Sequence, residues 1–323
     1  TDHVYFHINR IDVNDWYAGT VEVPVFTPGD VWVTEVTFQE ALSNDPPLTD
    51  FTVHFSPCAE VQAFFIHLSG LSERILAEVG TAFDQCDEYS ITGSGDFRNC
   101  TIRDLSIKVE AGEEFGKAGG NVYANALDLG VYDLRTPPLA YANPDRWPDR
   151  SLHIACPLDY FTPEVRDGLL ARLGMHDGSE RRTFEPICGE VEQDEPGTAQ
   201  GVWMTKGTVY TYPEDPHLAL VRDNLTPEWS VFSVGESTAA SGLDWGMYFF
   251  MSVGSGLVNR AFIDVTPGEV YCYEGLVLKF GKPAGLTVIL QMPTAATLHI
   301  ERIQDGCGQG PWTFSDLASE FER

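Results

Sequence analysis

Short strand-like runs recur along most of this sequence. Between residues 20 and 67, β-branched and aromatic runs are separated by turn sequences such as TPGD at 27–30. From residue 201 onward, similar runs return at intervals of about ten residues, which is typical of a sandwich or small barrel. Helical patterns are short, at 71–79 and 163–173. We therefore expect a mainly β protein with few short helices.

The length and the changes of composition predict two domains. A chain of 323 residues is long enough for two domains, each with its own core. A Pro-rich stretch at 135–148 and a polar, acidic stretch at 175–200 separate the two series of strands. The predicted parts are an antiparallel β domain at 1–140, a connector with one helix at 141–197, and an all-β sandwich or barrel at 198–323.

The chain is strongly acidic. It has 48 Asp and Glu against 20 Lys and Arg, which gives a net charge of −28 at pH 7. Nucleic acid and anionic membrane surfaces would be repelled, so we expect neither as a partner. The acidic side chains fit solubility, salt tolerance or calcium binding instead. No apolar run approaches the roughly 20 residues that cross a bilayer, so we expect no membrane span.

The cysteines indicate disulfides rather than a metal or redox motif. None of the seven forms a C-x-x-C pair, so a zinc ribbon is disfavoured. We expect an oxidising, extracellular compartment, up to three disulfides, and one cysteine that is unpaired or bonds another chain. Spacing favours the pairs Cys86–Cys100 and Cys272–Cys307. The candidate disulfide cysteines are Cys86, Cys100, Cys156, Cys188, Cys272 and Cys307.

Four motifs occur in an order that resembles the lysostaphin-type zinc endopeptidases of bacterial cell-wall turnover. VPVFTPGDVWV at 23–33 is similar to the family's P-V-x-A-x-x-x-G-x-V phrase, and FIHLS at 65–69 to its Y-x-H-L-S. VEAGEEFGKAG at 109–119 is similar to V-x-x-G-x-x-I-G-x-x-G, and ALD at 126–128 stands in place of H-L-H. The resemblance covers about residues 1–133 and implies an antiparallel peptidase-like sheet there.

The resemblance also implies a metal site with altered ligands. In the family, zinc is held by a His and an Asp of an H-x-x-x-D element and by the second His of H-x-H, and the remaining histidines assist the attacking water. Here Ala126 and Asp128 replace the two histidines of H-x-H, which implies a pseudoenzyme. A zinc-preserving alternative uses His3 and Asp128 as ligands, with Asp2 as a further candidate and His67 as the catalytic, transition-state-stabilising residue.

Other polar residues have both functional and structural interpretations. His54, His67 and Asp128 together outline a candidate binding groove, but a histidine beside Phe64 and Leu68 is also typical of a buried structural position. Clustered oxygens at 213–217 and 221–224 suit calcium, although no EF-hand loop is present and solvated turns are the competing interpretation.

Three functions follow from these patterns. The leading one is a secreted or cell-envelope protein, binding or structural, that holds a glycan, a peptide, peptidoglycan or another envelope protein on a degenerate peptidase-like domain. The second is an active metal-dependent cell-wall endopeptidase with a rearranged ligand set. The third is an oligomer-forming subunit of an extracellular surface layer or filament.

Overall fold

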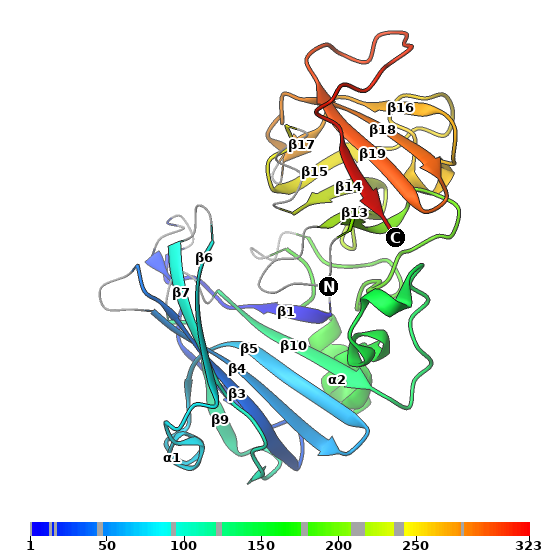
Figure 1. Cartoon of the computed structure of the whole chain (residues 1–323). Helices are drawn as coiled ribbons and strands as arrows, with labels where there is room; N and C mark the ends of the chain where they lie inside the picture. Colours follow the sequence, from blue (N-terminus) through cyan, green and yellow to red (C-terminus); the bar gives the residue numbers. More distant parts are fainter. Residues whose placement is uncertain are drawn as a thin grey trace. The chain divides into compact units, whose positions relative to one another are not determined.

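The protein folds into two compact units. The computed structural model describes residues 2–12, 15, 18–43, 48–91, 95–120, 125–175, 180–207, 217–235, 242–278 and 281–323. Unit 1 comprises Thr1–Pro138 and His153–Cys188, and unit 2 comprises Leu139–Leu152 and Gly189–Arg323 (Figure 1). The expected connector at 141–197 is thus divided between the units. Both units are antiparallel β structures with two α-helices among the described residues, which confirms the mainly β prediction.

Unit 1 is built on one curled sheet (Figure 1). Its main hydrogen-bonded order is β1-β10-β5-β4-β3-β7-β6, with β2, β8, β9 and β11 paired off this path. The strands are β1 (His3–His7), β2 (Val23–Phe26), β3 (Val31–Ala41), β4 (Leu48–Cys58), β5 (Val61–Leu71), β6 (Gln85–Ile91), β7 (Gly95–Ile102), β8 (Ile107–Val109), β9 (Glu114–Ala118), β10 (Ala126–Asp133) and β11 (Ile154–Ala155).

The helices form where local capping signals occur. Helix α1 (Glu73–Val79) begins after Ser72, whose hydroxyl accepts a hydrogen bond from the Ile75 backbone, and ends at Gly80, which has a φ of 70°. Helix α2 (Pro163–Leu170) has proline in its first turn, as the sequence predicted. Short 3-10 helices are η2 (Pro144–Arg146), η3 (Asp149–His153), η4 (Pro157–Tyr160) and η6 (Phe262–Asp264).

One face of the unit 1 sheet forms its hydrophobic core. Val53 and Phe55 of β4, Phe65 of β5 and Leu129 of β10 are each at most 4% exposed. Strand β9 places Phe115 against Phe55, with their ring centroids 5.6 Å apart. Because side chains alternate along a strand, the residues between these core positions face the other side of the sheet. We call that side the polar face.

Unit 2 is built on a nine-stranded sheet of order β16-β18-β19-β20-β12-β13-β14-β15-β17. Strands β16 and β17, at the two ends of this order, are joined by residues 274–276. The core of the unit includes Trp203, Phe232 and Tyr273. The strands are β12 (Gly201–Thr205), β13 (His217–Arg222), β14 (Trp229–Val234), β15 (Gly246–Met251), β16 (Val270–Tyr273), β17 (Val277–Leu278), β18 (Thr287–Thr294), β19 (Thr297–Ile303) and β20 (Ser319–Glu322).

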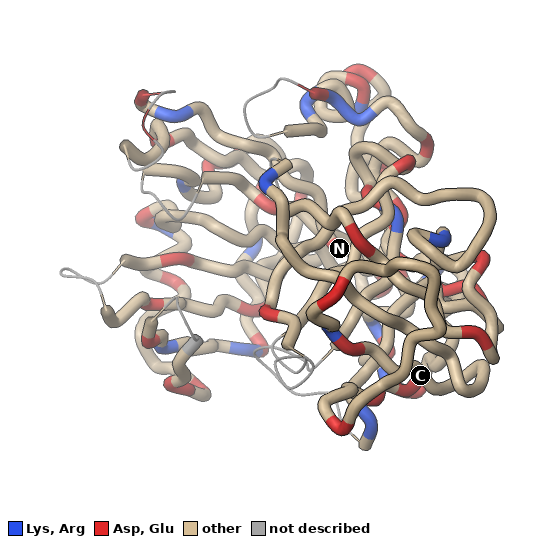
Figure 2. The backbone as a smooth tube through the Cα atoms, turned by 90° about the horizontal axis from the view of Figure 1, so that it is seen from above, with Lys and Arg blue, Asp and Glu red and all other residues tan. Residues whose placement is uncertain are grey.

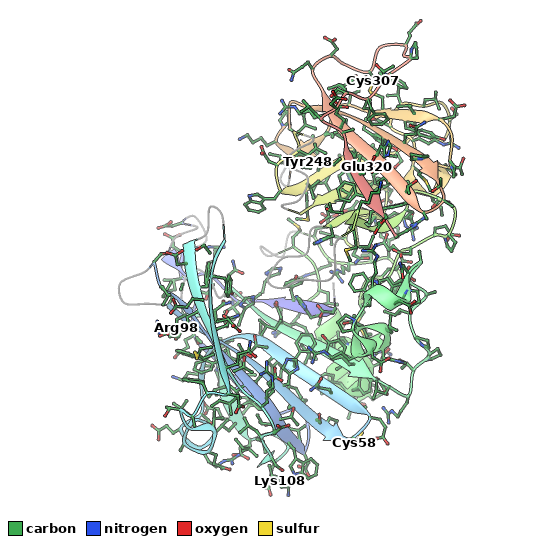
Figure 3. The ribbon with its side chains drawn as sticks, viewed as in Figure 1. Cys58, Arg98, Lys108, Tyr248, Cys307 and Glu320 are labelled. Carbon is green, nitrogen blue, oxygen red and sulfur yellow. A yellow bond between two sulfur atoms is a disulfide. The ribbon has the colours of Figure 1, made fainter. Side chains whose placement is uncertain are left out.

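Three disulfides stabilise the units: Cys86–Cys100 and Cys156–Cys188 in unit 1, and Cys272–Cys307 in unit 2. Both pairings expected from spacing are present. Cys58, at the end of β4, is free and exposed (Figure 3). The disulfides indicate an oxidising environment.

The acidic residues are spread over the described backbone of both units rather than gathered in one patch (Figure 2). Among the described helices, none has the length and apolar character required to span a bilayer.

Candidate functional site

Two histidines and three aspartates form a network on the polar face of unit 1. His3 Nδ1 lies 2.7 Å from Asp2 Oδ1, and His3 Nε2 lies 3.2 Å from Asp128 Oδ2. His67 Nδ1 lies 2.6 Å from Asp50 Oδ2, and His67 Nε2 lies 3.6 Å from the same Asp128 oxygen. The order is therefore Asp2, His3, Asp128, His67, Asp50, with Asp128 in the centre. We call these five residues the Asp–His network.

The strand order brings the network together. Strand β10 lies between β1 and β5, and Asp128 is paired with Tyr5 on one side and with Ile66 on the other. Val4 and Leu129 face the core, so His3 and Asp128 both face the polar side. The network therefore combines residues from the start of the chain with residues that follow more than a hundred positions later.

A β-bulge turns His67 toward the network. Phe65 and Leu68 both face the core, and the three steps between them along β5 oppose only two steps of β4. The extra residue places Ile66 and His67 together on the polar face, since a bulge re-aims the side chains around it. His67 has a φ of 67°, a left-handed conformation that is uncommon for a residue other than glycine.

Gly130 leaves the space that the network needs. A Cβ atom at Gly130 would lie 2.0 Å from Phe64 Cζ and 2.7 Å from the Asp2 carbonyl oxygen. The Phe64 ring therefore lies over Gly130, and its centroid is 6.2 Å from that of His3 and 5.5 Å from that of His54. Phe64 thus connects His54, the third predicted groove residue, to the network.

The carboxylates favour the cationic form of both imidazoles. Burial alone would lower the pKa of His3, but its hydrogen bonds with Asp128 and Asp2 outweigh that effect and raise the pKa to about 9. Burial would also lower the pKa of His67. The hydrogen bond with Asp50 and the charges of Asp50 and Asp128 outweigh this effect, so the pKa of His67 is raised. Burial alone would raise the pKa of Asp2, but its hydrogen bonds with His3 and Tyr132 and the charge of His3 outweigh that effect, so the pKa of Asp2 is lowered.

The raised pKa of His3 limits what this histidine does chemically at neutral pH. An imidazole that donates from both nitrogens has no lone pair with which to take a proton or bind a metal ion. In the part of the chain that the structure describes, no group of three or more His, Cys, Asp or Glu is arranged to hold a metal ion. Asp128 is 2% exposed, and its Oδ1 atom has no hydrogen-bond partner within those described ranges.

The structure thus brings together four of the residues that the sequence singled out, namely Asp2, His3, His67 and Asp128. It adds Asp50, which the sequence analysis missed. The alternation of β4 places residues 50, 52 and 54 on one face and could have grouped Asp50 with His54. The contact between Asp50 and His67 depends on the bulge in β5, and no motif in the sequence predicts that bulge.

The candidate calcium residues lie in unit 2. Residues 213–216 are outside the described ranges. In the second cluster, the Asn224 side chain exchanges hydrogen bonds with the Glu190 backbone, and Asp223 Oδ2 accepts from the backbone of Leu225 and Thr226. These contacts fit the turn interpretation.

The four motif segments are neighbours in the unit 1 sheet. Val23 pairs with Ala118, Ala118 pairs with Leu68, and Ile66 pairs with Asp128. No protein-family model, curated protein or solved structure matches the chain. Function is therefore argued from the residues of the site themselves.

Proposed function

We propose that the protein is a non-catalytic binding protein of the cell exterior or envelope. Its polar face in unit 1 recognises a glycan, a peptide or another envelope protein. The observation that carries this proposal is the placement of His3 between two carboxylates, with a pKa raised to about 9. A histidine held as a cation at neutral pH serves as a fixed donor and charge rather than as a general base.

The surroundings of the network support a binding role. His67 is partly exposed, with 37% of its side chain accessible, whereas Asp128 beneath it is 2% exposed. A ligand therefore reaches His67 before it reaches Asp128, which is held in place beneath it. In the sequence resemblance, Ala126 stands where the peptidase family has a histidine, and an alanine side chain cannot assist a water molecule. The three disulfides support a location outside the reducing cytosol.

The test measures binding and cleavage on the same material. Purified cell envelopes and peptidoglycan are incubated with the full chain, and bound protein and released peptide fragments are both quantified. We expect binding without release, and weaker binding by His67→Asn. The matched control is His299→Asn, because His299 Nε2 also lies near a carboxylate, 3.5 Å from Glu320 Oε1 in unit 2 (Figure 3). Release of peptide fragments that depends on added metal would contradict the proposal.

A second candidate is a metal-dependent endopeptidase that uses His3, His67 and Asp128. The observation that favours it is that both Nε2 atoms face the same Asp128 oxygen while a second carboxylate holds each Nδ1. Carboxylates that hold the outer nitrogen are typical of metal-binding histidines. The metal would displace the Nε2 protons and draw the three side chains closer together, where it would supply an acidified water.

Metal content decides between the two candidates. The protein is incubated with zinc, dialysed and measured by elemental mass spectrometry, together with His3→Gln, Asp128→Asn and the control His299→Gln. About one zinc per chain that is lost in the first two variants and kept in the control supports the endopeptidase. No retained zinc removes it.

A further inference from the structure

The polar face of unit 1 continues beyond the Asp–His network as two rows of hydrogen-bonding side chains. Directly paired residues of β4, β3, β7 and β6 form each row, and we call them the hydroxyl–amide rows. The first row is Thr52, Thr37, Thr101 and Gln85, and the second is Asp50, Gln39, Asn99 and Asp87. Asp50 belongs both to the second row and to the network, so the two features form one continuous surface.

Hydrogen bonds within the rows hold their side chains in place. Thr37 Oγ1 and Thr101 Oγ1 are 2.9 Å apart. Gln39 donates from Nε2 to the Tyr89 hydroxyl at 2.8 Å, and Tyr89 donates in turn to Asn99 Oδ1 at 3.4 Å. These groups are fixed before a ligand arrives, so less conformational entropy is lost on binding. A hydroxyl can donate one hydrogen bond and accept two, and an amide can donate two and accept two, so these side-chain types suit a ligand with many hydroxyl groups.

An aromatic pair borders the second row. Tyr89 and Phe97 are opposite each other on β6 and β7, with ring centroids 5.7 Å apart and an interplanar angle of 21°. Both are partly exposed. Flat rings of this kind offer an apolar surface, and the tyrosine adds a hydroxyl. The surface therefore combines stacking with dense hydrogen bonding.

The charge of the rows narrows the class of ligand. The chain carries 48 acidic residues, but only two of the eight row residues are acidic and none is basic. The two basic side chains at the ends of the rows are held by carboxylates: Arg103, which donates to Gln85 Oε1, lies 3.6 Å from Glu35, and His67 lies 2.6 Å from Asp50. The rows themselves therefore offer phosphate, sulfate and other anions no basic side chain. All eight row side chains are polar, so the rows themselves supply no apolar residue to fix a peptide side chain. The ligand that fits this surface is therefore uncharged and forms many hydrogen bonds. A molecule with many hydroxyl groups and apolar ring faces has both properties.

From these observations we infer that the hydroxyl–amide rows bind a neutral glycan chain. The sugar hydroxyls pair with the Thr, Asn and Gln groups, and one sugar ring packs on the Tyr89–Phe97 pair. This inference rests on the proposed function, since it names the ligand class of the same face.

Calorimetry with defined oligosaccharides tests the inference. The full chain is titrated with a hexamer of N-acetylglucosamine and with a hexamer of glucose, and a sulfated oligosaccharide serves as the anionic comparison. We expect at least one neutral hexamer to bind and the sulfated one not to bind. Thr37→Val and Asn99→Ala each remove row hydrogen bonds, and each should weaken binding about five- to tenfold.

The control variant is Thr297→Val. It removes one hydroxyl of the Thr294–Thr297 pair in unit 2, whose oxygens are 2.8 Å apart, and should leave the affinity unchanged. Equal unfolding midpoints of the variants and the native protein show that the fold is intact. If a row variant lowers its midpoint, Gln39→Glu, which keeps the side-chain size, replaces it.

Three outcomes overturn the inference. They are no binding of either neutral hexamer, equal affinity of the row variants and the native protein, and stronger binding of the sulfated oligosaccharide. If the hexamers fail while envelope material is still bound through His67, the glycan class is wrong and the proposed function stands. If envelope material also fails to bind, the proposed function itself is wrong.

Discussion

His67 Nδ1 lies 2.6 Å from Asp50 Oδ2, although the two residues are on strands whose register is interrupted between them. The bulge that interrupts the register is what brings them together. Asp128, on the other neighbouring strand of β5, lies 3.6 Å from the second nitrogen of the same ring. One histidine thus connects three strands, and its backbone conformation is part of that arrangement.

The left-handed backbone at His67 should make this position sensitive to the shape of the replacing side chain. Asparagine tolerates a φ of 67°, whereas valine does not. We expect His67→Val to lower the free energy of unfolding by about 1–2 kcal/mol more than His67→Asn does. Urea denaturation of both variants measures the difference. Equal stabilities would mean that the backbone relaxes at this position.

Gly130 should not tolerate a larger residue. A Cβ at this position meets Phe64 at 2.0 Å, so Gly130→Ala must displace the ring and should cost about 1–3 kcal/mol. The matched control is Gly70→Ala in β5, where a Cβ has no atom within 4 Å. Chemical denaturation compares the two variants. The interpretation fails if both lose the same stability.

The contribution of His3 to stability should depend on pH. Its folded pKa of about 9 lies above the ordinary histidine value of 6.5, so the stabilisation is fully present below about pH 6.5 and is lost as the pH rises through about 9. The difference corresponds to about 3 kcal/mol at low pH. The free energy of unfolding is measured at pH 6, 7.5 and 9.5, values chosen on either side of these pKa values. The gap between the native protein and His3→Gln should shrink across this series, and a constant gap would contradict the assignment.

Cys58 should be the reactive thiol of the folded protein. The other six of the seven cysteines form the three disulfides, and Cys58 is exposed. A maleimide reagent should label one site per native chain, and none in Cys58→Ser. After reduction in denaturant, mass spectrometry should find seven labels on the native sequence. More than one label before reduction would show that a disulfide is open.

The fold class could be predicted because the period of the strands is a local property. The run at 201–205 and the alternation in β4 both indicate strands without any knowledge of their partners. Helix α1 begins at Glu73, two residues after the start of the pattern at 71–79, because Ser72 supplies the N-terminal cap. The start of a helix is harder to predict than its presence, because it depends on which neighbouring residue caps the first turn.

The site could be predicted only in part. His67 and Asp128 were found through motifs, and His3 through its place near the expected ligand element. Asp50 was missed because its role depends on a bulge between strands, and the left-handed φ that forms the bulge falls on a histidine rather than on a glycine. The hydroxyl–amide rows were missed for a related reason, since cross-strand register is not encoded in any single segment.

The strand pairing of unit 2 also imposes an order on protein synthesis. Strand β12 pairs with β13, which follows soon after it, but also with β20. The ribosome must therefore make residues 206–318 before the second edge of β12 finds its partner. Until then Trp203, which is fully buried in the folded unit, lies on a strand with one unpaired edge. Non-local pairing of this kind is slow and exposes apolar surface to aggregation. We therefore expect the growing chain to depend on chaperones until its last strand is made.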